Sequence, residues 1–99
     1  MSNLPTGTLK PNEYYKIREI KPIRTRFGNT YLIYDRVHSE WYYAPTKIKK
    51  YLDTVSREQF ENGDGTWCKF KTHDYKSFNK KGQTIKFLDL EITKCLTSL

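Results

Sequence analysis

Apolar and polar residues alternate through the first part of the chain with the period of two that half-buried strands show. We expect a strand over residues 14–25, a glycine-containing turn at 26–29, a second strand over 30–37 and a short third strand over 41–44. Pro22 falls inside the first strand, which predicts an edge, a bend or a bulge there. Three antiparallel strands therefore precede any helix.

The period changes to that of an amphipathic helix after the third strand. This helix is expected to open at Pro45 and Thr46 and to end by Asn62 and Gly63. Its apolar stripe recurs at positions i, i+3, i+4 and i+7 and consists of Ile48, Tyr51, Leu52 and Val55. The pattern therefore predicts one helix packed on the strands.

Two further strands are expected after the helix. One covers residues 66–73, with Cys68 and Phe70 alternating into the interior, and the other covers 84–93, whose apolar run indicates a central position. The segment 74–83 between them is rich in lysine and is predicted to be a polar loop.

The order strand, strand, strand, helix, strand, strand is the layout of the OB-fold. This is a mainly β fold, a five-stranded antiparallel Greek-key barrel with one helix between strands 3 and 4, which binds oligonucleotides and oligosaccharides. We expect one such domain over residues 13–95, preceded by an extended lead-in over 1–12 and followed by a tail over 96–99.

Charge and aromatic content indicate the kind of ligand. Lys and Arg outnumber Asp and Glu by 18 to 11 in a chain of 99 residues, a formal net charge of +7. Residues 1–50 hold ten basic and four acidic residues, a charge of +6, whereas residues 51–99 hold eight and seven, a charge of +1. Aromatic residues make up 15% of the chain, more large rings than one small core hides easily. Rings that stack on bases, interleaved with cations that pair with phosphates, favour nucleic acid over an acidic protein or an anionic membrane.

Residues 14–52 resemble the short OB-fold single-stranded DNA-binding proteins of DNA viruses and mobile elements of invertebrates. The resemblance rests on Tyr15-Lys16-Ile17, on the turn Thr25-Arg26-Phe27-Gly28-Asn29-Thr30, and on Tyr43-Ala44-Pro45 before Ile48 and Leu52. Such proteins coat single strands in replication or recombination. They use the outer face of strands 2 and 3 and the loops that join strands 1 to 2 and 4 to 5. The resemblance implies DNA, favoured over RNA, as the partner, and the host cytoplasm or nucleus if the protein is viral, whereas the residues alone do not decide between DNA and RNA.

The candidate contact residues come from both loops and from the strands. The first loop offers Arg24, Arg26 and Phe27, and the second offers Lys76, Lys80 and Lys81. On the third strand Trp41 and Tyr43 are expected to be exposed and Tyr42 and Ala44 to point inward, whereas either face of the second strand can be the outer one. Each of these side chains also suits a core, rim or edge-protecting role when taken singly. The complete set is Lys16, Arg18, Arg24, Arg26, Phe27, Tyr31, Tyr34, Trp41, Tyr43, Trp67, Lys69, Lys71, Lys80 and Lys81.

Catalysis has little support in the sequence. Cysteine and histidine lack the spacing of a zinc site, and no glycine-rich phosphate loop is present, so we expect no enzyme, no metal and no cofactor. Two alternatives stay open. One is a protein-interaction or host-factor-inhibiting module with an OB-like fold, and the other is a small metal-dependent nuclease that would use Asp35.

Cysteine usage and hydropathy predict the compartment. The two cysteines could form at most one disulfide, the first twenty residues lack the apolar run of a secretory signal, and no stretch is long enough to cross a bilayer. We therefore expect a reduced, intracellular protein that does not insert into membranes. The oligomeric state stays open, because a free strand edge or the apolar residues 95–99 would suit a homo-oligomer but no heptad pattern is visible.

Overall fold

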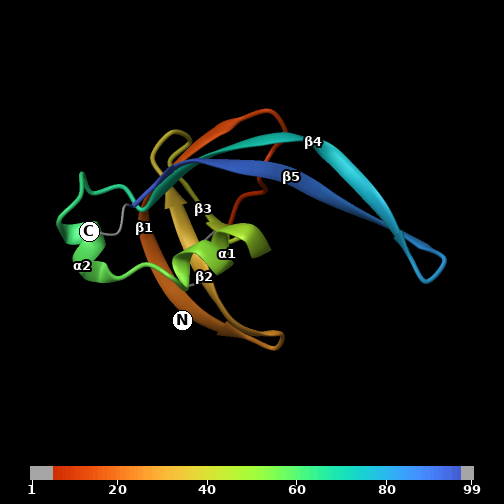
Figure 1. Ribbon diagram of the computed structural model, residues 1–99, viewed down its shortest axis with the longest axis horizontal. Helices are drawn as coiled ribbons and strands as arrows, with labels where there is room; N and C mark the ends of the chain where they lie inside the picture. Colours follow the sequence, from red (N-terminus) through yellow and green to blue (C-terminus); the bar gives the residue numbers. More distant parts are fainter. Residues whose placement is uncertain (1–5, 97–99) are drawn as a thin grey trace.

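The computed structural model describes residues 6–96, so residues 1–5 of the expected lead-in and residues 97–99 of the expected tail lie outside the described residues. Its five strands form one antiparallel sheet in the order β3-β2-β1-β4-β5 (Figure 1). The strands are β1 (Tyr14–Thr25), β2 (Gly28–Asp35), β3 (Glu40–Tyr43), β4 (Cys68–Lys80) and β5 (Gln83–Cys95). The expectation of a mainly β protein with five antiparallel strands is confirmed. Within residues 6–96 no ladder joins β3 to β5, so the sheet is open, and the OB-fold barrel stays a prediction.

The central strand β1 changes neighbours along its length. Its first four residues pair with β4, whereas most of its length pairs with β2. A bulge between Ile17 and Glu19 marks the change. Pro22 pairs with Tyr31 in the part of β1 that borders β2 alone, so its missing N–H costs no ladder bond on the open side. Of the three readings expected for Pro22, the edge position is therefore correct.

Two short helices replace the single helix that the periodicity predicted. They are α1 (Thr46–Leu52) and α2 (Arg57–Glu61). Ser56 begins the second one, because its side chain accepts a hydrogen bond from the backbone N–H of Gln59 while the Gln59 side chain accepts one from the Ser56 N–H. Such a capping box starts a new helix and ends the run of the old one. The predicted apolar stripe includes Val55, which lies beyond the end of α1, and this concealed the break.

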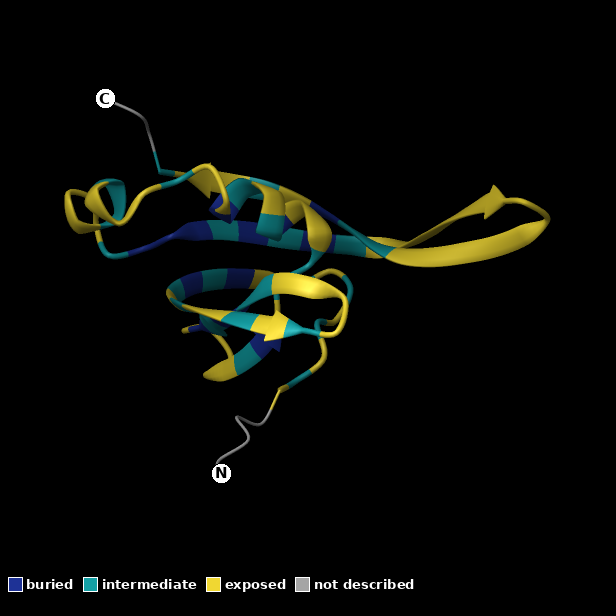
Figure 2. Cartoon of the chain, turned by 90° about the horizontal axis from the view of Figure 1, so that it is seen from below, coloured by how far each residue is buried: buried dark blue, intermediate teal, exposed yellow. Residues whose placement is uncertain are grey.

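The predicted polar loop at 74–83 is wrong, because β4 and β5 continue through it as a two-stranded ribbon. The ribbon projects from the body of the protein, as Figures 1 and 2 show. A two-residue turn closes it, in which Lys81 and Gly82 have φ values of 50° and 78°. Both turn residues thus lie in the left-handed region that tight hairpins use. We call residues 75–88 the arm.

The core lies between the inner face of the sheet and α1. Every strand and α1 contribute to it, and its fully buried side chains include Ile17, Ile33, Ile48 and Phe70. Figure 2 shows that burial is concentrated in the body, whereas the arm is exposed along its length beyond the base. The complete buried cluster is Tyr15, Ile17, Ile33, Tyr42, Ile48, Leu52, Trp67, Cys68, Phe70 and Leu90.

Candidate nucleic-acid interface

The outer face of β2 and β3 carries three aromatic rings. Strand register places Tyr34 beside Trp41 and Leu32 beside Tyr43, on the side of the sheet opposite the core residue Tyr42. The rings of Tyr34 and Trp41 are 5.3 Å apart between centroids, and Tyr43 is 56% exposed. We call Tyr34, Trp41 and Tyr43 the aromatic face. The expectation that Tyr43 points outward and Tyr42 inward is confirmed, whereas Trp41 is half-buried and not fully exposed as expected.

Leu32 forms the floor of the aromatic face. It is 6% exposed and yet does not belong to the core cluster, because its register partners Lys21 and Tyr43 lie with it on the outer side. Aromatic rings around an aliphatic floor, with a lysine at the margin, offer a base both a stacking surface and a cation nearby. The outer side of β2 is therefore the side of Leu32 and Tyr34, a choice that alternation alone left open.

The turn between β1 and β2 extends this surface. Phe27 is 88% exposed, and the guanidinium carbon of Arg26 lies 5.1 Å from the centroid of its ring. Both residues line a hollow of about 460 Å³ together with Tyr43 and Lys49. The hollow joins the exposed ring at the turn to the aromatic face through Tyr43, and two cations border it.

The arm carries exposed rings that the sequence analysis missed. Phe78 pairs with Ile85, and Lys76 pairs with Phe87, so these four side chains share one face of the ribbon. Phe78 and Phe87 are exposed, and their rings are 5.8 Å apart between centroids. The apolar residues on this face alternate with polar ones, and that alternation was the available signal for a ribbon in place of a loop.

Positive charge is concentrated on the arm. Residues 75–88 contain four lysines and no acidic residue, namely Lys76, Lys80, Lys81 and Lys86. Lys86 lies 5.0 Å from the centroid of the Tyr75 ring on the second face of the ribbon. Lys76 pairs with Asp89 at 3.1 Å, which lowers the pKa of that carboxyl group, whereas Lys80 and Lys81 stand exposed at the tip. The division of charge between the two halves of the sequence concealed this local excess.

A second basic area lies on the outer face of β1 and β4. Register places Lys16 beside Lys69 and Tyr14 beside Lys71, and the Lys71 ammonium lies 5.1 Å from the centroid of the Tyr14 ring. All three lysines are half-buried. This area thus keeps three of the predicted cations together and adds the exposed ring of Tyr14, which was not among the predicted residues.

Four of the residues predicted to contact nucleic acid lie away from these surfaces or make other contacts within the protein. Trp67 is 4% exposed and stacks on Phe60 with 4.3 Å between ring centroids, so it is a core residue and the prediction of a base contact is wrong. Tyr31 packs against the core and donates a hydrogen bond to Asp53 at 2.7 Å. Arg24 lines a different hollow, on the side of Tyr31 and Asp53.

Arg18 is the fourth of these residues. It stands at the bulge of β1, where its guanidinium donates to the Thr66 hydroxyl at 3.2 Å and to the Asp64 carbonyl at 3.4 Å. The bulge breaks the alternation that would have aligned Arg18 with Lys16. Arg18 therefore does not continue the face of Lys16, and its hydrogen bonds anchor the segment before β4.

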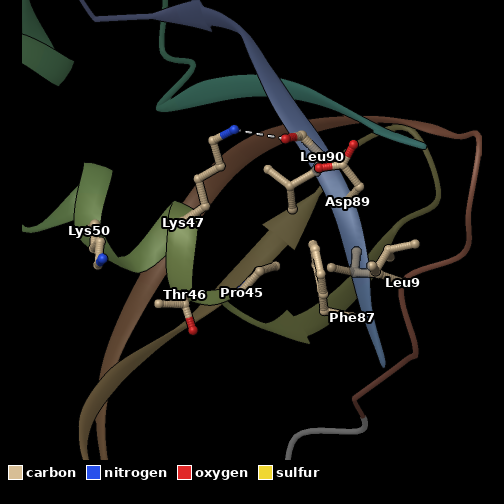
Figure 3. A pocket seen from close by; sticks show the side chains of 9 residues that line it. Leu9, Pro45, Thr46, Lys47, Lys50, Phe87, Asp89 and Leu90 are labelled. Carbon is tan, nitrogen blue, oxygen red and sulfur yellow. Dashed lines mark hydrogen bonds between the residues drawn. The ribbon is translucent and has the colours of Figure 1, made fainter. Parts of the chain in front are cut away.

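A further hollow, of about 420 Å³, lies where the segment after β3 faces β5 across the open seam of the sheet (Figure 3). Pro45 and Lys47 line it at the start of α1, Phe87 and Leu90 line it from β5, and Leu9 lies beside Phe87. Lys47 of α1 crosses the seam and donates a hydrogen bond to the carbonyl of Leu90 at 2.9 Å, drawn as a dashed line in Figure 3. The base of the arm therefore contacts the body through a side chain where a strand pair is missing.

Asp35, the candidate nuclease residue, is buried and fully used inside the protein. Its carboxylate accepts hydrogen bonds from the backbone N–H groups of Lys16, Val37 and His38 at 2.8 to 3.0 Å, and the His38 ring lies 2.5 Å away. A carboxylate engaged in this way fixes the β2–β3 turn against β1. Among residues 6–96 no group of three or more His, Cys, Asp or Glu side chains is arranged to hold a metal ion.

Comparison with known proteins does not assign the chain to a family. No family model, no curated protein and no solved structure matches the chain. In the part of the chain that the structure describes, neither α1 nor α2 is long and apolar enough to cross a bilayer. The functional argument therefore depends on the surfaces described above.

Proposed function

We propose that the protein binds single-stranded nucleic acid without strong sequence preference, with DNA favoured over RNA, and that it coats or protects single strands in replication or recombination. The arm carries this proposal. Four lysines without one acid, interleaved with exposed rings on a projecting ribbon, combine the two contacts that a single strand requires. The preference for DNA comes from the resemblance of residues 14–52 to viral and mobile-element proteins.

We also propose that the sheet is an OB-fold with one open seam. The position of β1 between β2 and β4, the helical segment between β3 and β4, and the seam between β3 and β5 agree with a partly open five-stranded barrel. In that fold the outer face of the second and third strands and the loops after the first and fourth strands bind oligonucleotides. Here those places are the aromatic face, the Arg26–Phe27 turn and the arm.

The mechanism is stacking plus charge neutralisation. Bases stack on Trp41, Tyr43 and Phe27, each contributing roughly 1 to 3 kcal/mol, because every base has a π-face that any aromatic ring can meet. Lysines of the arm release counterions from the phosphates, so the affinity falls as the salt concentration rises. Neither contact depends on the edge of a base, and this is why sequence preference is weak.

A protein-interaction module is the alternative that one observation favours. Phe78, Ile85 and Phe87 form an exposed apolar row on one face of the arm, and such a row also fits an apolar groove on another protein. The four arm lysines make an anionic partner the better match. The nuclease alternative has lost its candidate residue, because Asp35 is occupied by hydrogen bonds of the fold.

Photo-crosslinking tests the proposal and locates the surface. A single-stranded oligonucleotide that contains 5-iodouracil is irradiated with the full-length protein, and the crosslinked peptides are identified by mass spectrometry. We expect crosslinks in the peptides that contain Phe27, Trp41 and Phe78, and none in the peptide around Trp67. Absence of crosslinks, or crosslinks scattered without regard to these surfaces, contradicts the proposal and favours a protein partner.

A further inference from the structure

The two cysteines of the chain are direct partners across the β4–β5 ladder. Register pairs Cys68 with Cys95 at the end of the ladder opposite the arm tip, and both thiols are free. Residues paired in this way point to the same face of an antiparallel sheet. Cysteines that are far apart in the sequence are therefore held side by side by the fold.

The pair is of the close, non-hydrogen-bonded kind. The backbone N–H of Thr72 donates to the carbonyl of Glu13 at 2.9 Å, so Thr72 directs its backbone groups toward β1. Every second residue of a regular strand does the same, which assigns Phe70 and Cys68 to this set, and the N–H of Trp67 next to Cys68 also bonds to β1, at the carbonyl of Ile17 (2.8 Å). Cys68 thus has no backbone bond toward Cys95. Cα atoms of such pairs lie about 4.5 Å apart, at the lower end of the roughly 4.4 to 6.8 Å range of disulfides.

A tyrosine holds this end of the ladder together. The Tyr51 hydroxyl donates to the carbonyl of Trp67 at 2.7 Å and accepts from the N–H of Leu96 at 2.7 Å. Trp67 and Leu96 are the residues that flank Cys68 and Cys95, so one side chain from α1 joins both strands next to the pair. The cysteines are thereby kept in register at a strand end that would otherwise fray.

We propose that Cys68 and Cys95 form an intramolecular cross-strand disulfide when the folded protein meets a low-molecular-mass disulfide such as oxidised glutathione. The Cys95 thiolate attacks one glutathione sulfur, which forms a mixed disulfide and releases the first glutathione thiolate. The Cys68 thiolate then attacks the Cys95 sulfur and releases the second. The two protein thiols are oxidised to one disulfide, oxidised glutathione is reduced to two thiols, and the two protons pass to the released thiolates.

The environments of the two sulfurs set the order of the steps. Cys95 is exposed and meets the oxidant first, whereas Cys68 is buried and cannot be reached from solvent. Burial raises the pKa of the Cys68 thiol to about 12, so its thiolate is scarce and the closing step is the slower one. A transient mixed disulfide at Cys95 is expected before the closed form.

The test is mass spectrometry of the folded, full-length protein. The protein is incubated with oxidised glutathione, the remaining thiols are blocked with N-ethylmaleimide, and the intact mass is measured. We expect a monomer that has lost two hydrogens and carries neither glutathione nor maleimide, with a Tm roughly 10 °C above that of the reduced protein. A persistent mixed disulfide at Cys95 with Cys68 still free, or a disulfide-linked dimer, overturns the proposal.

Two controls separate pairing by the fold from chance oxidation. In guanidinium chloride the register is lost, so mixed disulfides on both cysteines should replace the closed form. Cys95→Ser changes an exposed residue and is expected to fold normally, and its remaining Cys68 should resist glutathione in the native state. Closure at equal rates in the folded and the denatured protein contradicts the proposal, because the ladder would then contribute nothing.

Discussion

The ring of Trp41 lies 5.3 Å from that of Tyr34, on the side of the sheet opposite the core. The other tryptophan of the chain, Trp67, is buried against Phe60. The two indoles therefore stand in different surroundings, one beside the proposed ligand and one inside the protein. This difference makes the intrinsic fluorescence a reporter for one surface.

If bases stack on Trp41, a bound oligonucleotide should quench the fluorescence of Trp41 and not that of Trp67. We expect oligothymidylate to quench the wild-type emission, Trp41→Phe to remove the quenching, and Trp67→Phe to preserve it. Trp41→Ala should weaken binding by about fivefold to 150-fold, as the loss of roughly 1 to 3 kcal/mol for a stacked base requires. Quenching that survives in Trp41→Phe would place the ligand elsewhere.

The tip of the arm should set the salt dependence of binding. Replacing Lys80 and Lys81 by Gln removes two exposed cations, and we expect the slope of log K against log salt to fall by about 1.4, because each single-strand phosphate contact contributes about 0.7. The matched control is Lys10→Gln with Lys50→Gln, which removes the same charge from exposed positions outside the arm. An equal loss of slope in both double variants would mean that only net charge matters.

Substitutions at Trp67 and Phe27 should have separate effects, the first on the stability of the fold and the second on nucleic-acid binding. Trp67→Ala removes a buried ring that stacks on Phe60, and we expect the free energy of unfolding in urea to fall by about 3 to 5 kcal/mol. Phe27→Ala changes a side chain that is 88% exposed and should alter the free energy of unfolding by less than about 0.5 kcal/mol while weakening binding. If Phe27→Ala lowered the free energy of unfolding and left binding unchanged, the Arg26–Phe27 turn would not belong to the interface.

Acid should weaken the link between the segment before β4 and the end of β5. Lys94 donates a hydrogen bond to Asp64 and lowers the pKa of its carboxyl group from 3.8 to about 2. A lowered pKa in the folded state adds stability that is complete above pH 4 and is lost as the pH falls toward 2. Urea unfolding of Asp64→Asn should therefore show a smaller loss between pH 4 and pH 2 than wild type, and parallel curves would contradict this role.

Alternation and turn chemistry predicted the strands of the body well. The period of two across residues 14–35 and the glycine of the Arg26–Phe27 turn were enough for the first hairpin, because one face of each strand meets the core. The inward position of Cys68 and Phe70 followed from the same alternation, and both are buried. The outer face of β2 could not be chosen in this way, because Leu32 on the outside is as apolar as Ile33 on the inside.

The arm and the bulge needed information that a local pattern does not contain. The frequent lysines of 74–83 are typical of a loop, and only pairing with β5 shows that they belong to a ribbon. Arg18 leaves the alternation because a bulge changes the partner of β1 from β4 to β2, a long-range event. Trp67 alternates with Cys68 and was therefore expected on the outer side, but it packs in the core against Phe60 of α2. These residues were misassigned where a distant segment decided their surroundings.

The most direct measurement is a titration of fluorescently labelled single-stranded DNA, single-stranded RNA and duplex DNA of equal length, followed by anisotropy and tryptophan emission at low and moderate salt. We predict tight binding to the single strands, DNA ahead of RNA, with quenching and a steep loss of affinity at the higher salt, and weaker binding to the duplex. Absence of binding to all three ligands at both salt concentrations would contradict the proposed function and direct the search to a protein partner.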